Sequence, residues 1–276
     1  MHRRYIMFTP FVKEDNVLNE NPFMKHEVQF NLMHRIIEGD LDVALKISND
    51  KAIALSNFGR AMWLWVNKEL EQGTIDNIVD MISENVSNRK IQGIAADPRV
   101  AKQFAEKYSK NCGITYKKSM GLQSYYCTEV IKTRSNKGKM MLSKNTHTHQ
   151  IAKYCVDFIL DGYGQEVTVE SQLSGAEQLI NSGNLYLWSV DSDIVTMAHV
   201  THRSVRHARI NYVYTPPQRR KNGYASALVA ELSLLLLNEG LTPMLYADLK
   251  NPQSNKVYKN IGYKEAGKIE QYDFAY

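Results

Sequence analysis

The sequence predicts an α/β protein of the α+β kind, in which helices pack on a mixed sheet, and two observations lead to this class. Segments with the alternation or β-branched composition of strands recur along the chain, and between them lie segments with apolar residues at helical spacing. The chain has 276 residues, more than one average domain. We therefore expect two domains, at residues 1–136 and 137–276.

The N-terminal half is expected to alternate helices and strands. The expected elements are, in chain order, a helix near Lys25–Glu38, strands at Lys51–Ser56 and Ala61–Val66, a helix at Ile75–Val86, a strand at Ile91–Ala96 and a helix after Asp97-Pro98. Isoleucine and valine at helical spacing give the second helix one apolar face. Aspartate followed by proline is typical of an N-cap and a first helical position, which predicts the start of the last helix.

The C-terminal half is expected to begin with a strand at Lys139–Leu142, after a polar stretch at 134–138 that we interpret as the linker. Two helical stripes follow, carried by Ile151, Cys155, Phe158 and Ile159 and then by Val169, Leu173, Ala176, Leu179 and Ile180. Strands are then expected at Leu185–Val190, Ile194–Thr201 and Val205–Thr215, with a turn at 191–193. Cys155 lies on an apolar stripe, so we interpret it as a core residue and not as a nucleophile.

The segment from residue 213 to 225 is the most informative, because it contains a strand end, a break, a basic loop and a helix start in that order. Two consecutive prolines stop the strand ladder. Gly223 permits close approach of a ligand, and the helix after it, which Gly240 ends, offers N–H groups and a dipole that favour a phosphate. Together with the positive charges of Arg219–Lys221, these features predict a site for a polyanion.

A second segment follows the same logic. A short strand at Pro243–Ala247 precedes Asn251-Pro252, which is typical of an N-cap and a first helical position. Gly262 is expected to end this helix after about two turns. Tyr258 lies on the helix, where it either packs in the core or serves a site.

These two segments carry a family resemblance. The run from Arg220 through Gly223 to Ala225 resembles the Arg/Gln-x-x-Gly-x-Gly/Ala signature of the GNAT superfamily of acyl-CoA-dependent N-acetyltransferases. The later segment resembles the Asn…Tyr…Gly-aromatic pattern that closes GNAT domains, through Asn251, Ser254, Asn255, Tyr258 and Gly262-Tyr263. The resemblance covers the C-terminal half and implies a GNAT fold there.

The resemblance also implies roles for particular residues, with acetyl-CoA as co-substrate and no metal. Val213 and Thr215 would contact the pantetheine arm, and Tyr258 would protonate the departing thiolate. The other implied cofactor contacts are Arg220, Lys221, Gly223, Tyr224, Ala225, Ser226, Asn251 and Ser254.

The N-terminal half resembles a GNAT domain only in the order of its elements. No Arg-x-x-Gly-x-Gly run follows its expected strand at Ile91–Ala96. Two interpretations stay open: a smaller, degenerate second GNAT copy that has lost phosphate binding, which would make the protein a tandem one, or an unrelated α/β domain.

The implied function is transfer of an acetyl group from acetyl-CoA to a primary amine of a small molecule or peptide, by direct attack in a ternary complex. A thioester is already activated, so the protein must position the amine, stabilise the oxyanion and protonate the sulfur. Many GNAT enzymes place a glutamate base on the strand before the loop, but Ala208–Tyr212 contains no carboxylate. His199, His202 and His207 are candidates for a relay through water. The alternative is a non-catalytic CoA-binding or regulatory module.

Composition argues against other classes. The net charge of +5 is dispersed, so we expect no nucleic-acid partner; a phosphate track of Arg203, Arg206, Arg209, Arg219 and Arg220 would instead give salt-dependent binding. His147 and His149 have no cysteine or carboxylate at ligand spacing, so no metal is expected. Three cysteines without a Cys-x-x-Cys pair, and no apolar stretch of ~20 residues, favour a cytoplasmic protein without a membrane partner. The acceptor and the oligomeric state are not specified by these patterns.

Overall fold

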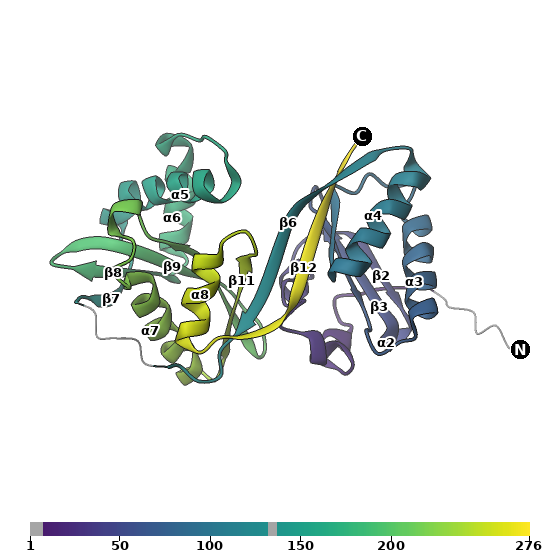
Figure 1. Ribbon diagram of the computed structural model, residues 1–276, viewed down its shortest axis with the longest axis horizontal. Coiled ribbons are helices and arrows are strands. Elements are labelled where there is room, and N and C mark those ends of the chain that lie inside the picture. Colours follow the sequence, from purple (N-terminus) through teal and green to yellow (C-terminus); the bar gives the residue numbers. More distant parts are fainter. Residues whose placement is uncertain (1–7, 132–136) are drawn as a thin grey trace, which may run out of the picture. The chain divides into compact units, whose positions relative to one another are not determined.

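The computed structural model describes residues 8–131 and 137–276, and these form two compact units (Figure 1). Unit 1 contains the chain up to Ser124, with Ala247–Asn251 and Glu265–Tyr276, and unit 2 contains Tyr125–Tyr246 and Pro252–Lys264. The expected division was a single cut after residue 136, whereas these units exchange segments near the C-terminus. Most of the expected linker at 134–138 lies outside the described residues.

Unit 1 is built on a mixed sheet in the order β1-β2-β3-β4-β5-β12-β6. Its strands are β1 (Phe8–Pro10), β2 (Leu41–Ile47), β3 (Ala52–Asn57), β4 (Met62–Val66), β5 (Gly93–Ala96), β6 (Thr115–Tyr126) and β12 (Lys264–Ala275). The strands from β1 to β4 pair antiparallel, and β12 pairs antiparallel with β5. Between them β4 and β5 run parallel, joined by a crossover through helix α3 (Gln72–Asn85), because parallel neighbours cannot be joined by a tight turn.

Both faces of the unit 1 sheet are buried. One face packs against α3 and α4 (Pro98–Cys112), and Asp97 caps α4 as expected by accepting a hydrogen bond from the Arg99 N–H at 3.4 Å. On the other face, Phe23 lies edge-on to Trp65 with ring centroids 5.5 Å apart. The remaining helical segments of the unit are short: η1 (Asn16–Asn19), η2 (Phe23–His26), α1 (Leu32–Ile36) and α2 (Ser48–Lys51).

Unit 2 is built on strands in the order β11-β10-β9-β8-β7. They are β7 (Lys139–Leu142), β8 (Leu185–Val190), β9 (Asp193–Arg203), β10 (His207–Tyr214) and β11 (Thr242–Asp248), the last two residues of β11 being counted in unit 1. Neighbours from β7 to β10 are antiparallel, and β10 runs parallel to β11 through the crossover helix α7 (Tyr224–Asn238). This arrangement places the N-terminus of α7 directly after the end of β10.

Helices cover both faces of the unit 2 sheet (Figure 1). The other helices of the unit are η3 (Asn145–His147), α5 (Thr148–Tyr163), α6 (Val169–Asn181), η4 (Pro217–Arg219) and α8 (Pro252–Ile261). α5 and α6 pack on one face, where Ile151 and Cys155 meet Leu185 and Leu187 of β8, and α7 and α8 lie on the other. Cys155 is 3% exposed, as expected of a core residue, and burial raises the pKa of its thiol to about 11.

The predicted α/β class is confirmed, and so is the order of elements in unit 2, but one expected helix does not form and several strands were not predicted. The prediction of a helix near Lys25–Glu38 is wrong, because only the short helices η2 and α1 form there. The segment buries the polar side chains of Glu27, Gln29 and Asn31, so it has no continuous apolar face. β2, β6 and β12 were not predicted. β12 is rich in charged residues and the first part of β6 is exposed, so neither shows a clear alternation. No described helix is long and apolar enough to cross a membrane.

Candidate functional site

The two parallel strands of unit 2 separate soon after they begin. β10 and β11 pair at three positions, from His207 opposite Thr242 to Arg209 opposite Met244. β10 then continues to Tyr214, and in this part it pairs with β9. The sheet therefore opens toward the carboxyl ends of two parallel strands, which is where ligands bind in α/β proteins.

The part of β10 beyond this opening is irregular. Its register with β9 shifts between Arg209 and Ile210 and again between Asn211 and Tyr214, and Tyr212 has a positive φ of 51°. Such a bulge turns main-chain groups away from their usual direction, and bulges are common beside sites. Sequence reasoning missed this feature, because tyrosine carries no preference for positive φ.

The connection from β10 to α7 ends in an uncapped helix N-terminus. β10 stops before the two prolines as expected, and the loop then passes through Lys221 and Gly223, whose φ values are 64° and 76°. Gly223 is the N-cap residue of α7 and has no side chain that accepts hydrogen bonds from the first turn. The N–H groups of Tyr224, Ala225 and Ser226 have no intrahelical acceptor, so they and the helix dipole form a position that favours an anion.

Two of the three cations of this loop are engaged in holding it. The Arg220 Nε donates to the Thr215 carbonyl at 2.8 Å, and its guanidinium pairs with Asp161 of α5. Arg219 pairs with Asp193 at 2.7 Å. Lys221 is exposed and forms no ion pair with any residue that the structure describes. Lys221 is therefore the cation most available to a ligand.

Tyr258 lies on α8, with its ring 5.9 Å from that of Tyr263 and 6.1 Å from that of Tyr125. The residue is 8% exposed, and burial raises its pKa to about 12. Its hydroxyl forms no hydrogen bond within residues 8–131 and 137–276, and its raised pKa keeps it protonated at pH 7. The described contacts of Tyr258 do not join it to the loop before α7.

The other predicted residues near α8 fall in different units. Asn251 belongs to unit 1 and its N–H bonds the Asp248 carbonyl at 3.0 Å, whereas Ser254 lies on α8 in unit 2. Sequence reasoning missed the pairing of Tyr125 with Asn255, whose Oδ1 accepts a hydrogen bond from the tyrosine hydroxyl at 2.9 Å. These residues are 130 positions apart, so no local pattern reveals the contact.

His199 of β9 is the histidine whose environment is best defined. It is 6% exposed, its Nε2 lies 3.1 Å from the Ser182 Oγ, and its ring stands edge-on to Tyr212. Burial, reinforced by the charge of Arg203, lowers the pKa of His199 to about 4. The side chain is therefore neutral at pH 7.

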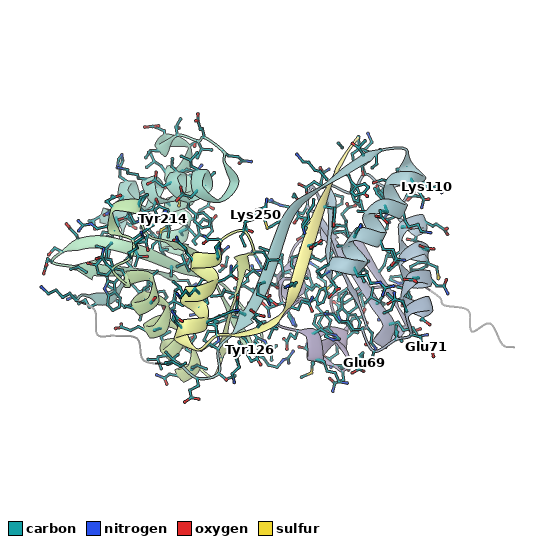
Figure 2. All side chains as sticks on the ribbon, in the orientation of Figure 1. Glu69, Glu71, Lys110, Tyr126, Tyr214 and Lys250 are labelled. Carbon is teal, nitrogen blue, oxygen red and sulfur yellow. The ribbon has the colours of Figure 1, made fainter. Side chains whose placement is uncertain are left out.

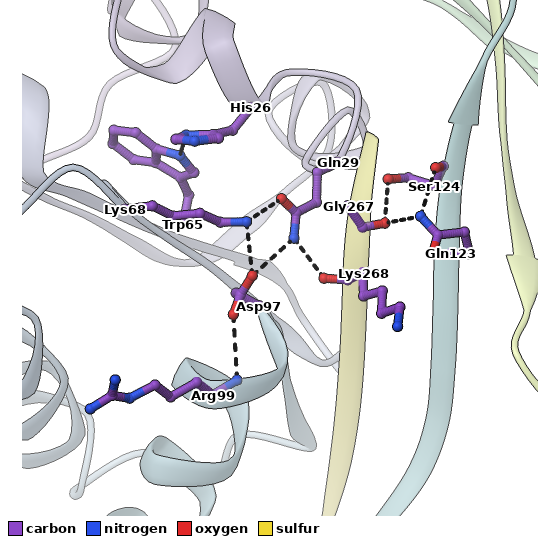
Figure 3. A network of polar contacts seen from close by, with 10 residues as sticks. All are labelled: His26, Gln29, Trp65, Lys68, Asp97, Arg99, Gln123, Ser124, Gly267 and Lys268. Atoms are coloured by element: carbon purple, nitrogen blue, oxygen red, sulfur yellow. Dashed lines mark hydrogen bonds and ion pairs between the residues drawn. The ribbon is translucent and has the colours of Figure 1, made fainter. Parts of the chain in front are cut away.

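Unit 1 repeats the sequence of strand, crossover helix and parallel strand, but polar side chains bridge its strand ends (Figure 3). Beyond the three paired positions of β4 and β5, the Lys68 ammonium lies 2.8 Å from the Asp97 carboxylate and donates to the Gln29 Oε1 at 2.8 Å. Gln29 is 1% exposed, and its Nε2 donates to the Lys268 carbonyl at 2.6 Å. The cluster of Gln29, Lys68 and Asp97 links the ends of β4 and β5.

The loop before α3 also differs in charge from the loop before α7. It carries Glu69 and Glu71, which are labelled in Figure 2. Lys25 pairs with Glu69 at 2.5 Å, and its hydrogen bond to this carboxylate lowers the pKa of Glu69. Carboxylates at a helix N-terminus satisfy the dipole that a bound phosphate would otherwise satisfy.

Comparison with known proteins bears on these features. A family model described as FR47-like protein matches residues 189–272, a stretch that includes the loop before α7 and the whole of α8. No curated protein matches the sequence significantly. A solved GCN5-related N-acetyltransferase from Sphaerobacter thermophilus is similar with a TM-score of 0.63 at 14% identity, over 99% of this chain and 96% of that chain.

Two further solved structures are similar over nearly the whole chain. An acetyltransferase of the GNAT family from Colwellia psychrerythraea has a TM-score of 0.55 at 13% identity, over 98% of this chain and 100% of that one. The chain has the GNAT acetyltransferase fold. A Drosophila protein gives a TM-score of 0.62 at 10% identity, over 98% of this chain and 99% of that one. The likeness to GNAT-fold structures thus extends beyond the C-terminal half, in which the signature lies.

Proposed function

We propose that the protein is an acyl-CoA-dependent N-acetyltransferase that transfers an acetyl group from acetyl-CoA to a primary amine. The observation that carries this proposal is the uncapped N-terminus of α7, which follows directly on the opened end of β10. It provides N–H donors for a diphosphate next to a strand that has parted from its parallel neighbour, which suits an extended arm.

The residues present fit this co-substrate. Gly223 has no side chain over the α7 N-terminus, so a diphosphate would meet the N–H groups of the first turn, with Lys221 as a mobile cation. Val213 and Thr215, at and beyond the bulge, would hold the pantetheine arm. Asn251 and Ser254 stay predicted contacts of the cofactor.

The reaction needs one proton moved and one bond exchanged. The lone pair of a neutral amine attacks the acetyl carbonyl carbon, a main-chain N–H near Thr215 stabilises the oxyanion, and the carbon–sulfur bond breaks. The nitrogen loses one proton and the sulfur gains one, so amide and thiol are formed without net consumption of protons. Tyr258 supplies the proton to the sulfur and regains one from the amine through water.

The compartment and partners proposed are those of a small-molecule enzyme. The three cysteines are free, in keeping with a reducing cytoplasm. Arg203, Arg219 and Arg220 pair with carboxylates of Glu239, Asp193 and Asp161, which argues against a phosphate track for nucleic acid.

A thermal shift with acetyl-CoA, run beside an assay of free thiol released with a panel of amines, tests the proposal. We expect stabilisation by acetyl-CoA, by about 2.7 kcal/mol at a hundred times the dissociation constant, and thiol release with at least one amine. Stabilisation without thiol release would favour the non-catalytic CoA-binding module. The absence of a carboxylate on Ala208–Tyr212 is the observation that favours this alternative. An absence of both responses would contradict any CoA-binding function.

A further inference from the structure

One face of α5 lies along the end of β10. Tyr154, Asp157, Phe158 and Asp161 stand at positions i, i+3, i+4 and i+7, so they form a single stripe on the helix. Tyr154 packs on Tyr214, the last residue of β10, with ring centroids 5.5 Å apart. Figure 2 labels Tyr214, close to α5.

The rest of the stripe contacts the bulge and the loop. Phe158 packs on Tyr212 with ring centroids 5.1 Å apart, and both residues are half-buried. Asp161 pairs with Arg220 of the loop before α7. The stripe therefore follows β10 from its bulge into the proposed diphosphate loop, and Asp157 lies within it.

Asp157 is a carboxylate without a cation. It is half-buried and forms no ion pair with any residue in the described ranges, unlike Asp161 one turn later. Burial raises the pKa of Tyr214 above its usual range, the nearby charges of Asp157 and Asp161 raise it further, and the charge of Arg220 lowers it. A hydrogen bond with the Asp157 carboxylate adds to the rise, so Asp157 lies beside the Tyr214 hydroxyl. Burial also raises the pKa of Tyr154; a hydrogen bond with Gln150 and the charge of Arg219 lower it, and the charge of Asp157 adds to the rise.

The same aromatic group contains a buried polar atom without a partner among the described residues. The Nδ1 of His199, whose ring centroid lies 6.4 Å from that of Tyr212, is buried and has no hydrogen-bond partner among the described residues. Buried polar atoms are nearly always paired, so an orphan beside Tyr212 indicates a water molecule or ligand at this place.

A carboxylate set among aromatic rings is the chemistry that recognises an organic ammonium group. The carboxylate supplies charge and hydrogen-bond acceptors, and the faces of aromatic rings attract cations. We infer that Asp157 is the residue that recognises the cationic nitrogen of the acceptor, which it holds against Phe158 and Tyr212 at the end of β10. This inference rests on the proposed acyl transfer, and the bound ammonium releases one proton to water before its lone pair attacks.

Binding of a non-natural probe tests the inference independently of turnover. Benzylammonium and its neutral analogue benzyl alcohol are titrated into the full chain, with CoA present, and binding is followed by NMR. We expect the wild type to bind benzylammonium at least tenfold more tightly than benzyl alcohol, and Asp157→Asn to lose that preference. Equal binding of the two probes by the wild type, or an unchanged preference in Asp157→Asn, would overturn the inference.

Kinetics with the best acceptor of the amine panel provide the second readout. Asp157→Asn should raise KM for the amine at least tenfold and leave kcat within about threefold, whereas Asp157→Glu, which keeps the charge, should recover most of the loss. The matched control is Glu177→Gln on α6, an exposed carboxylate of the same unit without an ion pair in the described chain, and it should change neither value.

The outcomes separate the two proposals. Thiol release by the wild type together with an unchanged KM in Asp157→Asn leaves the acetyltransferase intact and rejects the role of Asp157. Absence of thiol release with every amine rejects the acetyltransferase, and the benzylammonium titration still decides whether Asp157 forms an ammonium site. The acetyl-CoA thermal shift of each variant must match the wild type, which shows that a lost preference does not come from misfolding.

Discussion

At the scale of single residues, Tyr258 combines deep burial with a hydroxyl that has no hydrogen bond among the described residues. Replacing it with phenylalanine removes the donor and keeps the packing, so we expect Tyr258→Phe to lower kcat by about 10²–10⁴-fold and to leave CoA affinity unchanged. Turnover and the CoA thermal shift are measured on the same preparation. Equal turnover in the variant and the wild type would mean that another group protonates the sulfur.

The pKa of Tyr258 gives this residue a pH signature. A phenol with a pKa of about 12 stays protonated throughout the neutral and mildly alkaline range, so its deprotonation cannot reduce turnover below about pH 11. We therefore expect that wild-type kcat does not decline between pH 8 and 10 through loss of the Tyr258 proton. A decline in this range that Tyr258→Phe abolishes would contradict the prediction.

His199 predicts a dependence of stability on pH. Its ordinary pKa of 6.5 applies in the unfolded chain, and its pKa is about 4 in the folded protein. Between these values the unfolded chain binds a proton that the folded protein does not, so the free energy of unfolding falls as the pH drops from 6.5 to 4, by up to about 3 kcal/mol. His199→Gln does not titrate and should lose less of its Tm between pH 7 and 5 than the wild type. A parallel decline in both proteins would show that other groups dominate.

At the scale of elements, the start of α7 is where the loop and the helix dipole act together. The left-handed Gly223 position accommodates aspartate and asparagine better than other side chains, and both cap a helix N-terminus. Gly223→Asp places a negative charge over the N–H groups that would hold the diphosphate, so we expect CoA affinity to fall more than tenfold with an unchanged or raised Tm.

Gly223→Asn is the matched control for that change. It has nearly the same shape and capping ability without the charge, so any difference in CoA affinity between the two variants measures electrostatic repulsion alone. Isothermal titration with CoA at low and high salt checks this, because screening weakens the difference. Equal CoA affinity in the two variants would contradict the proposal that the diphosphate binds at the α7 N-terminus.

At the scale of the whole molecule, the two units share an order of strands and helices but differ in the residues at the ends of their parallel strands. In unit 1 the Gln29, Lys68 and Asp97 cluster links the ends of β4 and β5, and Glu69 lies in the loop before α3. We therefore predict one CoA per chain in isothermal titration. Gly223→Asp should weaken all of the measured binding and not only a part of it. A stoichiometry of two, or loss of half of the binding in that variant, would contradict the prediction.

The sequence by itself determined the features that depend on neighbouring residues. The end of β10 before the prolines and the start of α7 after Gly223 were predicted, because Pro and Gly restrict or widen the backbone at their own positions. Cys155 in the core was predicted for a similar reason, since helical spacing is local.

Only the tertiary structure decided the features that depend on distant residues. The positive φ of Tyr212, the separation of β10 from β11, and the approach of Asp157 to Tyr214 arise where strands and helices far apart in sequence meet, and no short pattern encodes such a meeting. The position of β12 in unit 1 also depends on distant residues. This strand is rich in charged residues and alternates weakly, so its pairing with other strands determines where it lies.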